Sequence, residues 1–229
     1  MTLALPISRS ARLARTLRRL ALVPLCLSLA ACGGLGVGSD EIPSPRNNRA
    51  KASERFTQMV QSGRPLMQVT VQRKELAGFA VREVQRDGVD TYQSADGIAL
   101  KLRDGFLVGT AGFGGDMLGS NVSDSMALIL RRRGGTAERF HTFLNGENQA
   151  VTRTYLCVVS QRDPRKIDVA TRAGTYRSVA TALMKEDCKS LDQSFSNLYW
   201  ISSATGRVVQ SRQWAGDFTG PLVMQQVIE

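Results

Sequence analysis

The chain has little of the chemistry that metal centres and redox sites require. It has 229 residues, one histidine (His141) and four cysteines. A single histidine excludes a multi-histidine metal site, and a Ser-His-Asp triad would have to use His141, which lies on a predicted strand where a structural role is the expected one. No cysteine pair has the Cys-x-x-Cys spacing of redox motifs. We therefore predict no catalytic residue, no metal site and no cofactor.

The chain also lacks an apolar run long enough to span a bilayer. The run at residues 20–29 has the length of a secretory signal core. Five arginines and no acidic residue precede it, namely Arg9, Arg12, Arg15, Arg18 and Arg19. Leu29-Ala30-Ala31-Cys32 follows and has the form of a lipobox. We predict that residues 1–31 are a lipoprotein signal peptide and that Cys32 is the lipidated first residue; the alternative is an ordinary signal peptide.

Acylation of Cys32 with two or three chains would anchor the protein stably to a membrane. Gly33 rather than aspartate follows the cysteine, which favours the outer membrane under the general sorting rule. The signal peptide carries five arginines and no carboxylate, so its removal lowers the formal net charge from +10 to +5. The remaining charge and the export signal together argue against a nucleic-acid partner.

Residues 32–50 are rich in glycine, proline and asparagine and predict a flexible tether from Cys32. Residues 51–229 have the length of one ordinary domain, which we expect to face the periplasm. Cys157 and Cys188 are the cysteines left in it. In an oxidising compartment this pair is most simply a disulfide, with two buried thiols or a redox site as the alternatives.

Periodicity predicts a mainly β domain with two short helices. A stripe of apolar residues indicates a helix at residues 50–61. Alternation with Asp-Gly turns predicts an antiparallel meander over residues 66–111. A glycine-rich turn at residues 112–119 leads to a second helix, which is capped by Ser123 or Asp124, filled by residues 126–130 and ended by Gly134 after three arginines. Further strands are predicted at residues 139–144, 149–159, 166–171, 176–188, 195–202, 207–214 and 222–228, with an Asn145-Gly146 turn. About ten strands predict an antiparallel β-sandwich or open barrel.

The glycine-rich turn is the predicted binding loop. It comprises Gly112, Phe113, Gly114, Gly115, Asp116, Met117 and Leu118. It is no phosphate loop, because the Gly-Lys-Ser/Thr of that motif is missing. Exposed apolar side chains on such a loop would supply contact area for a partner. In the competing structural interpretation, the apolar side chains turn inward and plug the end of the sheet, while Asp116 caps backbone amides.

Two other patterns have binding interpretations beside structural ones. Residues 131–133 are three arginines that could hold phosphate or uronate groups, although a solvated helix end is the simpler explanation. Four aromatic residues could form a sugar-stacking platform, although core packing is the default; they are Tyr199, Trp200, Trp214 and Phe218. Aspartate and glutamate residues are scattered along the chain, so the sequence does not exclude the pair of carboxylates that a glycoside hydrolase uses.

Four segments resemble the YjbF/GfcB lipoproteins of group 4 capsule and exopolysaccharide production. They are LRDGFLVGTAGFGGDML at residues 102–118, FLNGENQ at 143–149, FSNLYW at 195–200 and SRQW at 211–214. The resemblance implies a periplasm-facing outer-membrane lipoprotein of largely β structure that assists assembly or export of a surface polysaccharide. It supplies no catalytic residues.

Three functions follow as hypotheses. In the first, a non-enzymatic accessory protein binds an outer-membrane β-barrel protein, the polysaccharide export machinery or the polymer itself. In the second, a half-open barrel carries a lipid or a lipid-linked glycan, which requires an apolar cavity of several hundred Å3. In the third, a polysaccharide hydrolase requires paired carboxylates in one cleft.

Overall fold

The structure is a computed structural model that describes residue 54, residues 57–144, residue 147 and residues 149–229. The described residues belong to one structural unit, residues 44–229. The predicted signal peptide, Cys32, the tether and the Asn145-Gly146 turn lie outside the described residues. Residues 54 and 57–61 are helical, in agreement with the described part of the helix predicted at residues 50–61.

Twelve strands form one antiparallel sheet among the described residues. The strands are β1 (Leu66–Val71), β2 (Leu76–Arg86), β3 (Val89–Ser94), β4 (Ala99–Arg103), β5 (Phe106–Ala111), β6 (Met117–Asn121), β7 (Gly135–Leu144), β8 (Ala150–Ala170), β9 (Tyr176–Lys189), β10 (Ser194–Ser202), β11 (Val208–Trp214) and β12 (Pro221–Val227). A short 3-10 helix, η1 (Gln72–Lys74), follows β1, and α2 (Ser123–Leu130) follows β6.

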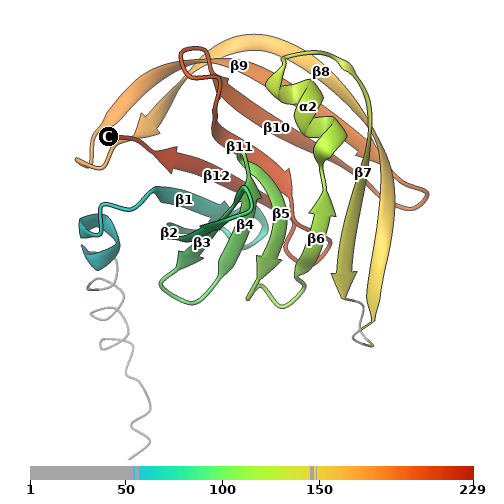
Figure 1. Cartoon of the computed structure of the whole chain (residues 1–229), viewed down its shortest axis with the longest axis horizontal. Helices are drawn as coiled ribbons and strands as arrows, with labels where there is room; N and C mark the ends of the chain where they lie inside the picture. Colours follow the sequence, from blue (N-terminus) through green and yellow to red (C-terminus); the bar gives the residue numbers. More distant parts are fainter. Residues whose placement is uncertain (1–53, 55–56, 145–146, 148) are drawn as a thin grey trace, which may run out of the picture. The chain divides into compact units, whose positions relative to one another are not determined.

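The sheet curls into a nearly closed barrel. Its strand order is β5-β4-β3-β2-β1-β12-β11-β10-β9-β8-β7-β6, so the two edge strands, β5 and β6, are consecutive in the chain. Figure 1 shows these two strands side by side at the seam of the curled sheet. A Cβ placed on Gly109 of β5 would lie 3.5 Å from the backbone oxygen of Met117 in β6. The open-barrel prediction is thereby confirmed, and the sandwich alternative is not the observed form.

The predicted meander at residues 66–111 is confirmed, because β1 to β5 pair in sequence order. Two of its turns use Asp-Gly in the left-handed conformation that a tight hairpin requires. Asp87 and Gly88 have φ of 52° and 74°, and Asp104 and Gly105 have φ of 48° and 87°. Asparagine, aspartate and glycine tolerate these angles better than other residues, which is why the pattern was readable from sequence.

Two local predictions were wrong. Strand β6 separates the glycine-rich loop from α2, although its sequence, Met-Leu-Gly-Ser-Asn, does not alternate; pairing with β7 makes it a strand. The strands predicted at residues 149–159 and 166–171 are one strand, β8, whose register shifts between Arg162 and Arg165. That irregularity accommodates Pro164, which cannot donate to a regular ladder. The extra strand β6 and the division of the meander into five raise the count from about ten to twelve.

The cap of α2 also differs from the prediction. Its N-cap is Val122, whose side chain makes no capping hydrogen bond. The Asn121 side chain accepts a hydrogen bond from the backbone N–H of Ser123 instead, at 3.1 Å. Ser123 and Asp124 therefore lie inside the first turn. At the other end Arg132 has φ of 56° and leaves the helix, with its guanidinium donating to the Ser202 carbonyl.

The core lies inside the curled sheet, and most of it belongs to two large apolar clusters. One cluster packs side chains of β1 to β6 against β12 and includes Met67, Leu100, Leu107 and Leu222. The other packs α2 through Ile129 against side chains of β5 and β8 to β11. A smaller cluster lies where Met59 of the N-terminal helical residues packs on Leu66 of β1. The helix α2 thus fills part of the interior.

Candidate functional site

The predicted binding loop joins the two edge strands of the barrel. Its Asp116 carboxylate accepts hydrogen bonds from the backbone N–H groups of Gly112, at 3.0 Å, and Phe113, at 3.1 Å. The Thr110 hydroxyl donates to the same carboxylate at 3.0 Å and accepts from the Met117 N–H at 2.9 Å. Asp116 therefore caps the loop backbone and links the end of β5 to the start of β6. This is the geometry of the competing structural interpretation.

Two of the three apolar side chains of the loop region are buried. Phe113 is 6% exposed and Met117 is fully buried, both within the apolar cluster of β1 to β6 and β12. The expectation that they are exposed contact residues is therefore wrong, because the open end of the barrel needs apolar side chains to exclude water. Leu118 alone points outward and is 47% exposed. A binding role for the loop as a whole stays a prediction.

The glycines of the loop have a different role, which is to let a distant aromatic ring approach. A Cβ on Gly115 would lie 2.4 Å from the Cβ of Phe218, and a Cβ on Gly114 would lie 3.2 Å from its ring. Phe218 comes from the turn between β11 and β12, yet it covers the loop and remains 57% exposed. The Lys74 ammonium lies 4.9 Å from the centre of its ring. Larger residues at positions 114 and 115 would displace this ring.

Several large apolar side chains are exposed at this end of the barrel, which we name the apolar end. They are Leu76 at the start of β2, Leu118 at the start of β6, Leu144 at the end of β7, Val151 in β8 and Phe218. A cavity of about 200 Å3 lies beside Phe218, Leu144 and Val151. Its wall includes the ion pair between Arg153 and Asp217, at 2.8 Å. Clustered exposed apolar side chains are typical of surfaces that bind a partner.

The apolar end also accounts for the role of Gly216. This residue has φ of 108°, and a Cβ on it would lie 2.7 Å from the ring of Phe143. The turn after β11 therefore packs directly on β7, beside the cavity. The sequence contained a signal for this contact, since Gly216 and Gly220 bracket Phe218, but the partner strand lies about seventy residues away and could not be read from the pattern.

A buried polar layer crosses the middle of the barrel. The guanidinium of Arg139 donates to Glu186 at 2.7 Å and to His141 Nε2 at 2.8 Å, and Asn197 donates to the same Glu186 oxygen at 2.7 Å. The side chains of Arg139 and Glu186 are fully buried. Burial lowers the pKa of Arg139 but the Glu186 carboxylate raises it, and the net direction is upward. Arg139 therefore stays charged inside the protein.

His141 is a neutral member of this layer. Burial, and then the charge of Arg139, lower its pKa well below the usual value of 6.5. Its ring stacks on Phe195, with 5.5 Å between ring centres. The side chain is inaccessible to solvent, so it cannot reach a substrate from this position. Its hydrogen-bond partner, Arg139, is two residues away on the same strand, whereas Glu186, which pairs with Arg139, lies 47 residues further along the chain.

Gln213 connects the polar layer to the edge of the sheet. Its side-chain oxygen accepts a hydrogen bond from the backbone N–H of Leu107 at 2.9 Å, and its nitrogen donates to the Gly105 carbonyl at 2.7 Å. These two groups belong to the start of edge strand β5. The amide of Gln213 thus takes the place of a neighbouring strand and hides part of an edge that would otherwise be free to pair with other chains.

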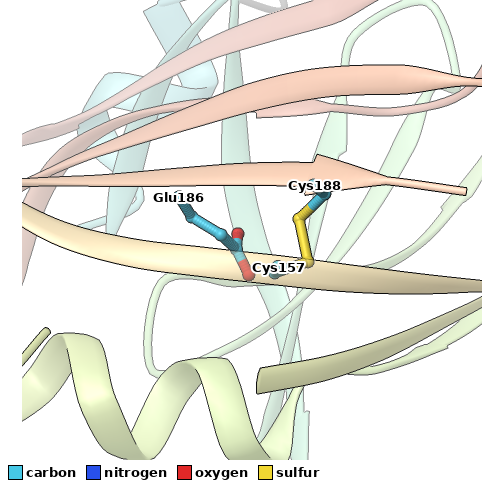
Figure 2. Close-up of side chains that lie close together, drawn as sticks. All are labelled: Cys157, Glu186 and Cys188. Carbon is cyan, nitrogen blue, oxygen red and sulfur yellow. A yellow bond between two sulfur atoms is a disulfide. The ribbon is translucent and has the colours of Figure 1, made fainter. Parts of the chain in front are cut away.

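Figure 2 shows the Cys157–Cys188 disulfide beside Glu186. The two cysteines are directly opposite one another on β8 and β9, and both are buried. The predicted disulfide is confirmed. The sulfurs and a Glu186 oxygen lie within 4.8 Å of one another, a spacing compatible with metal ligands. Both sulfurs are bonded to each other, so neither supplies the thiolate that a metal would bind.

The other sequence-based candidates are dispersed. Tyr199 is buried and stacks on Phe106, while Trp200, the next residue of β10, points to the opposite face of the sheet. Trp214 stacks on Phe195 with 5.9 Å between ring centres. The four aromatic residues therefore do not form a shared sugar-stacking platform. Among the described residues, no helix has the length and apolar character needed to cross a membrane.

The fold and the disulfide define a class, which is a twelve-stranded, disulfide-linked antiparallel domain in barrel-like form. A solved structure of this fold is the hypothetical lipoprotein YmcC from Escherichia coli K12, to which this chain is similar with a TM-score of 0.65 and 20% identity. The similarity covers 81% of this chain and 96% of that one.

The sequence model of one family, the group 4 capsule polysaccharide lipoprotein gfcB, YjbF, matches residues 46–227. The chain belongs to this YjbF family of lipoproteins linked to capsule polysaccharide production. The resemblance seen in the four sequence segments is thereby confirmed. No match was found among curated proteins.

Proposed function

We propose that the protein is a non-enzymatic accessory factor, anchored to the periplasmic face of the outer membrane through lipidated Cys32, that acts in the assembly or export of a capsule or exopolysaccharide. Membership of the YjbF family supports the pathway. The lipobox supports lipidation of Cys32, and Gly33 supports sorting to the outer membrane. The buried positions of His141 and Glu186 support a structural rather than a chemical role for the central polar layer.

The observation that carries the accessory role is the combination of a filled interior with an apolar end. The apolar cavity between β1, β2 and Phe113 measures about 100 Å3. Another cavity, of about 270 Å3, has a mainly polar lining. A lipid carrier needs a larger apolar space. Exposed Phe218, Leu144 and Val151 instead offer a surface for a protein of the export machinery, such as an outer-membrane β-barrel.

The anchor is tested with Cys32→Ser in cells that lack the chromosomal copy. We expect the variant to leave the membrane fraction or to accumulate as uncleaved precursor, and polymer at the cell surface to decrease. Cys26→Ser is the matched control, because Cys26 lies in the predicted signal peptide and its loss should change neither quantity. Mass spectrometry of the N-terminus identifies the acylated cysteine.

Three results would contradict the proposal. A soluble periplasmic version that restores full polysaccharide secretion would show that the anchor is dispensable. Normal surface polymer in cells without the protein would remove it from the pathway altogether. Release of cleaved sugars from purified polymer by the protein would replace the accessory role with a hydrolase.

A further inference from the structure

A polar cavity of about 270 Å3 lies at the end of the barrel opposite the apolar end. The topology places the polar cavity and the apolar end at opposite ends of strand β5. This strand begins at the Asp104-Gly105 turn, which lines the cavity, and it ends at the glycine-rich loop. The walls come from β2, β3, β12, the turn before β11 and the end of α2. The polar lining includes Arg82, Asp90, Tyr92, Asp104, Arg207 and Gln226.

Tyr92 is the strongest sign that this cavity takes a ligand. The residue is 5% exposed and packs with Leu100 and Leu102 in the apolar core, while it also lines the cavity. Its hydroxyl makes no hydrogen bond with any residue that the structure describes. The hydroxyl oxygen is not sealed inside the core, so it can donate a hydrogen bond to a ligand in the cavity. Burial raises the pKa of Tyr92, and the hydroxyl stays a neutral donor.

The charges around the cavity are balanced. Arg82 and Asp90 form an ion pair at 3.3 Å, with both side chains half-buried. Arg207 and Asp104 lie exposed at the rim, and neither has an ion-pair partner among the described residues. Two guanidinium groups thus face two carboxylates. A net charge of zero gives little attraction for an anion such as phosphate or a uronate.

A polyhydroxylated ligand matches this lining. A sugar hydroxyl both donates and accepts, so neighbouring hydroxyls can bond a carboxylate and a guanidinium or amide together. The apolar side chains of Leu130 and Val208 provide contacts for the C–H face of a sugar ring. The volume is at the small end of the range for ligand sites, roughly 300 to 1,000 Å3, which suits one or two sugar residues rather than a lipid.

We propose that this cavity binds one or two residues of a neutral saccharide, with Tyr92 and Arg207 as hydrogen-bond donors. The existence of the binding site is argued from the residues that line the cavity. The identification of the saccharide with a unit of the exported polymer rests on the proposed function.

The test is calorimetric titration of the full lipoprotein in detergent. The probes are glucose, galactose, N-acetylglucosamine, glucuronate, inorganic phosphate and oligosaccharides from partial hydrolysis of the cell's own surface polymer. We expect a neutral sugar or oligosaccharide to bind and glucuronate and phosphate to bind more weakly. Tyr92→Phe keeps the ring in the core and removes only the hydroxyl, so it should weaken binding about fivefold to tenfold.

Two controls keep the result interpretable. Tyr176→Phe changes an exposed tyrosine on β9 and should leave binding unchanged. Arg207→Ala changes an exposed rim residue and should weaken binding without altering the fold, while Arg165→Ala on β8 is its matched control. Arg207→Ala also keeps the proposal testable if Tyr92→Phe lowers stability.

Failure of this proposal is separable from failure of the proposed function. An absence of binding by every neutral probe at millimolar concentration overturns the site, as does binding that is unchanged in both Tyr92→Phe and Arg207→Ala, or tighter binding of glucuronate or phosphate. Cleavage of a bound oligosaccharide overturns it as well. Sugar binding in a protein whose deletion leaves polymer export normal supports the site and contradicts the accessory role.

Discussion

The two ends of the barrel have opposite character. At the apolar end, Phe113 and Met117 close the interior while Phe218 packs over glycines, and several large apolar side chains are exposed. At the other end, an open cavity is lined by charged and polar groups around the Tyr92 hydroxyl. One curled sheet thus separates two surfaces of different chemical character. An apolar surface suits a protein partner, and a polar cavity suits a small hydrophilic one.

The largest effect on stability is expected at the apolar end. Phe113→Ala removes a ring that is 6% exposed and leaves a cavity, so it should lower the free energy of unfolding by about 3 to 5 kcal/mol. Leu118→Ala is the control, because Leu118 is half exposed and its loss should cost little. Chemical denaturation measures both. Equal and small effects would mean that Phe113 does not plug the barrel.

The disulfide joins β8 to β9 and lines neither of the two cavities, so its loss should affect stability rather than binding at either end. Cys157→Ser combined with Cys188→Ser is expected to lower the free energy of unfolding by about 2 to 4 kcal/mol, because the crosslink no longer restricts the unfolded chain. Folded protein should still bind sugar and partner. Loss of one binding activity in the folded variant would show that the bond shapes that end directly.

The buried histidine predicts how stability depends on pH. The imidazole of His141 is neutral in the folded protein, since its pKa is well below 6.5, whereas in the unfolded chain it titrates near 6.5. As pH falls below about 6.5, the unfolded state gains a proton that the folded state does not, so stability decreases. Above that value the contribution is complete.

Denaturation between about pH 7.5 and 5 measures this dependence in a range where most carboxylates stay ionised. His141→Gln should show a flatter profile over the same range, even though the variant is less stable overall. A wild-type profile as flat as that of the variant would contradict the neutral, buried imidazole.

The smallest effect on stability and the sharpest on function are expected from Phe218→Ala. The ring is 57% exposed, so its loss should change the free energy of unfolding by less than about 1 kcal/mol. If the apolar end binds a partner, crosslinking to that partner and surface polymer should both decrease. Sugar binding at the other end should not change.

Tyr92→Phe is expected to give the converse result: sugar binding should weaken, and crosslinking to the partner should not change. Loss of both activities in either variant would show that the two ends are coupled. The two ends would then have to be described as one extended site rather than as two separate ones.

Some features of the protein could be predicted from local chemistry alone. The Asp87-Gly88 and Asp104-Gly105 turns and the alternating residues between them specify the meander, because conformation there depends on neighbouring residues. The lipobox and the two remaining cysteines are also local or countable signals. The glycine-rich loop was correctly identified as unusual, but its partner Phe218 lies about a hundred residues further along the chain.

The sequence by itself determined the β class, the turns, the pairing of the only two cysteines expected in the domain and the family. The tertiary structure decided which apolar side chains of the loop are buried, and it brought Arg139 to Glu186, Gln213 to the edge of β5, and Tyr92 to the polar cavity. The physical reason is the curl of the sheet. Periodicity specifies which residues share a face of a strand, whereas closure decides which faces and edges meet across the interior.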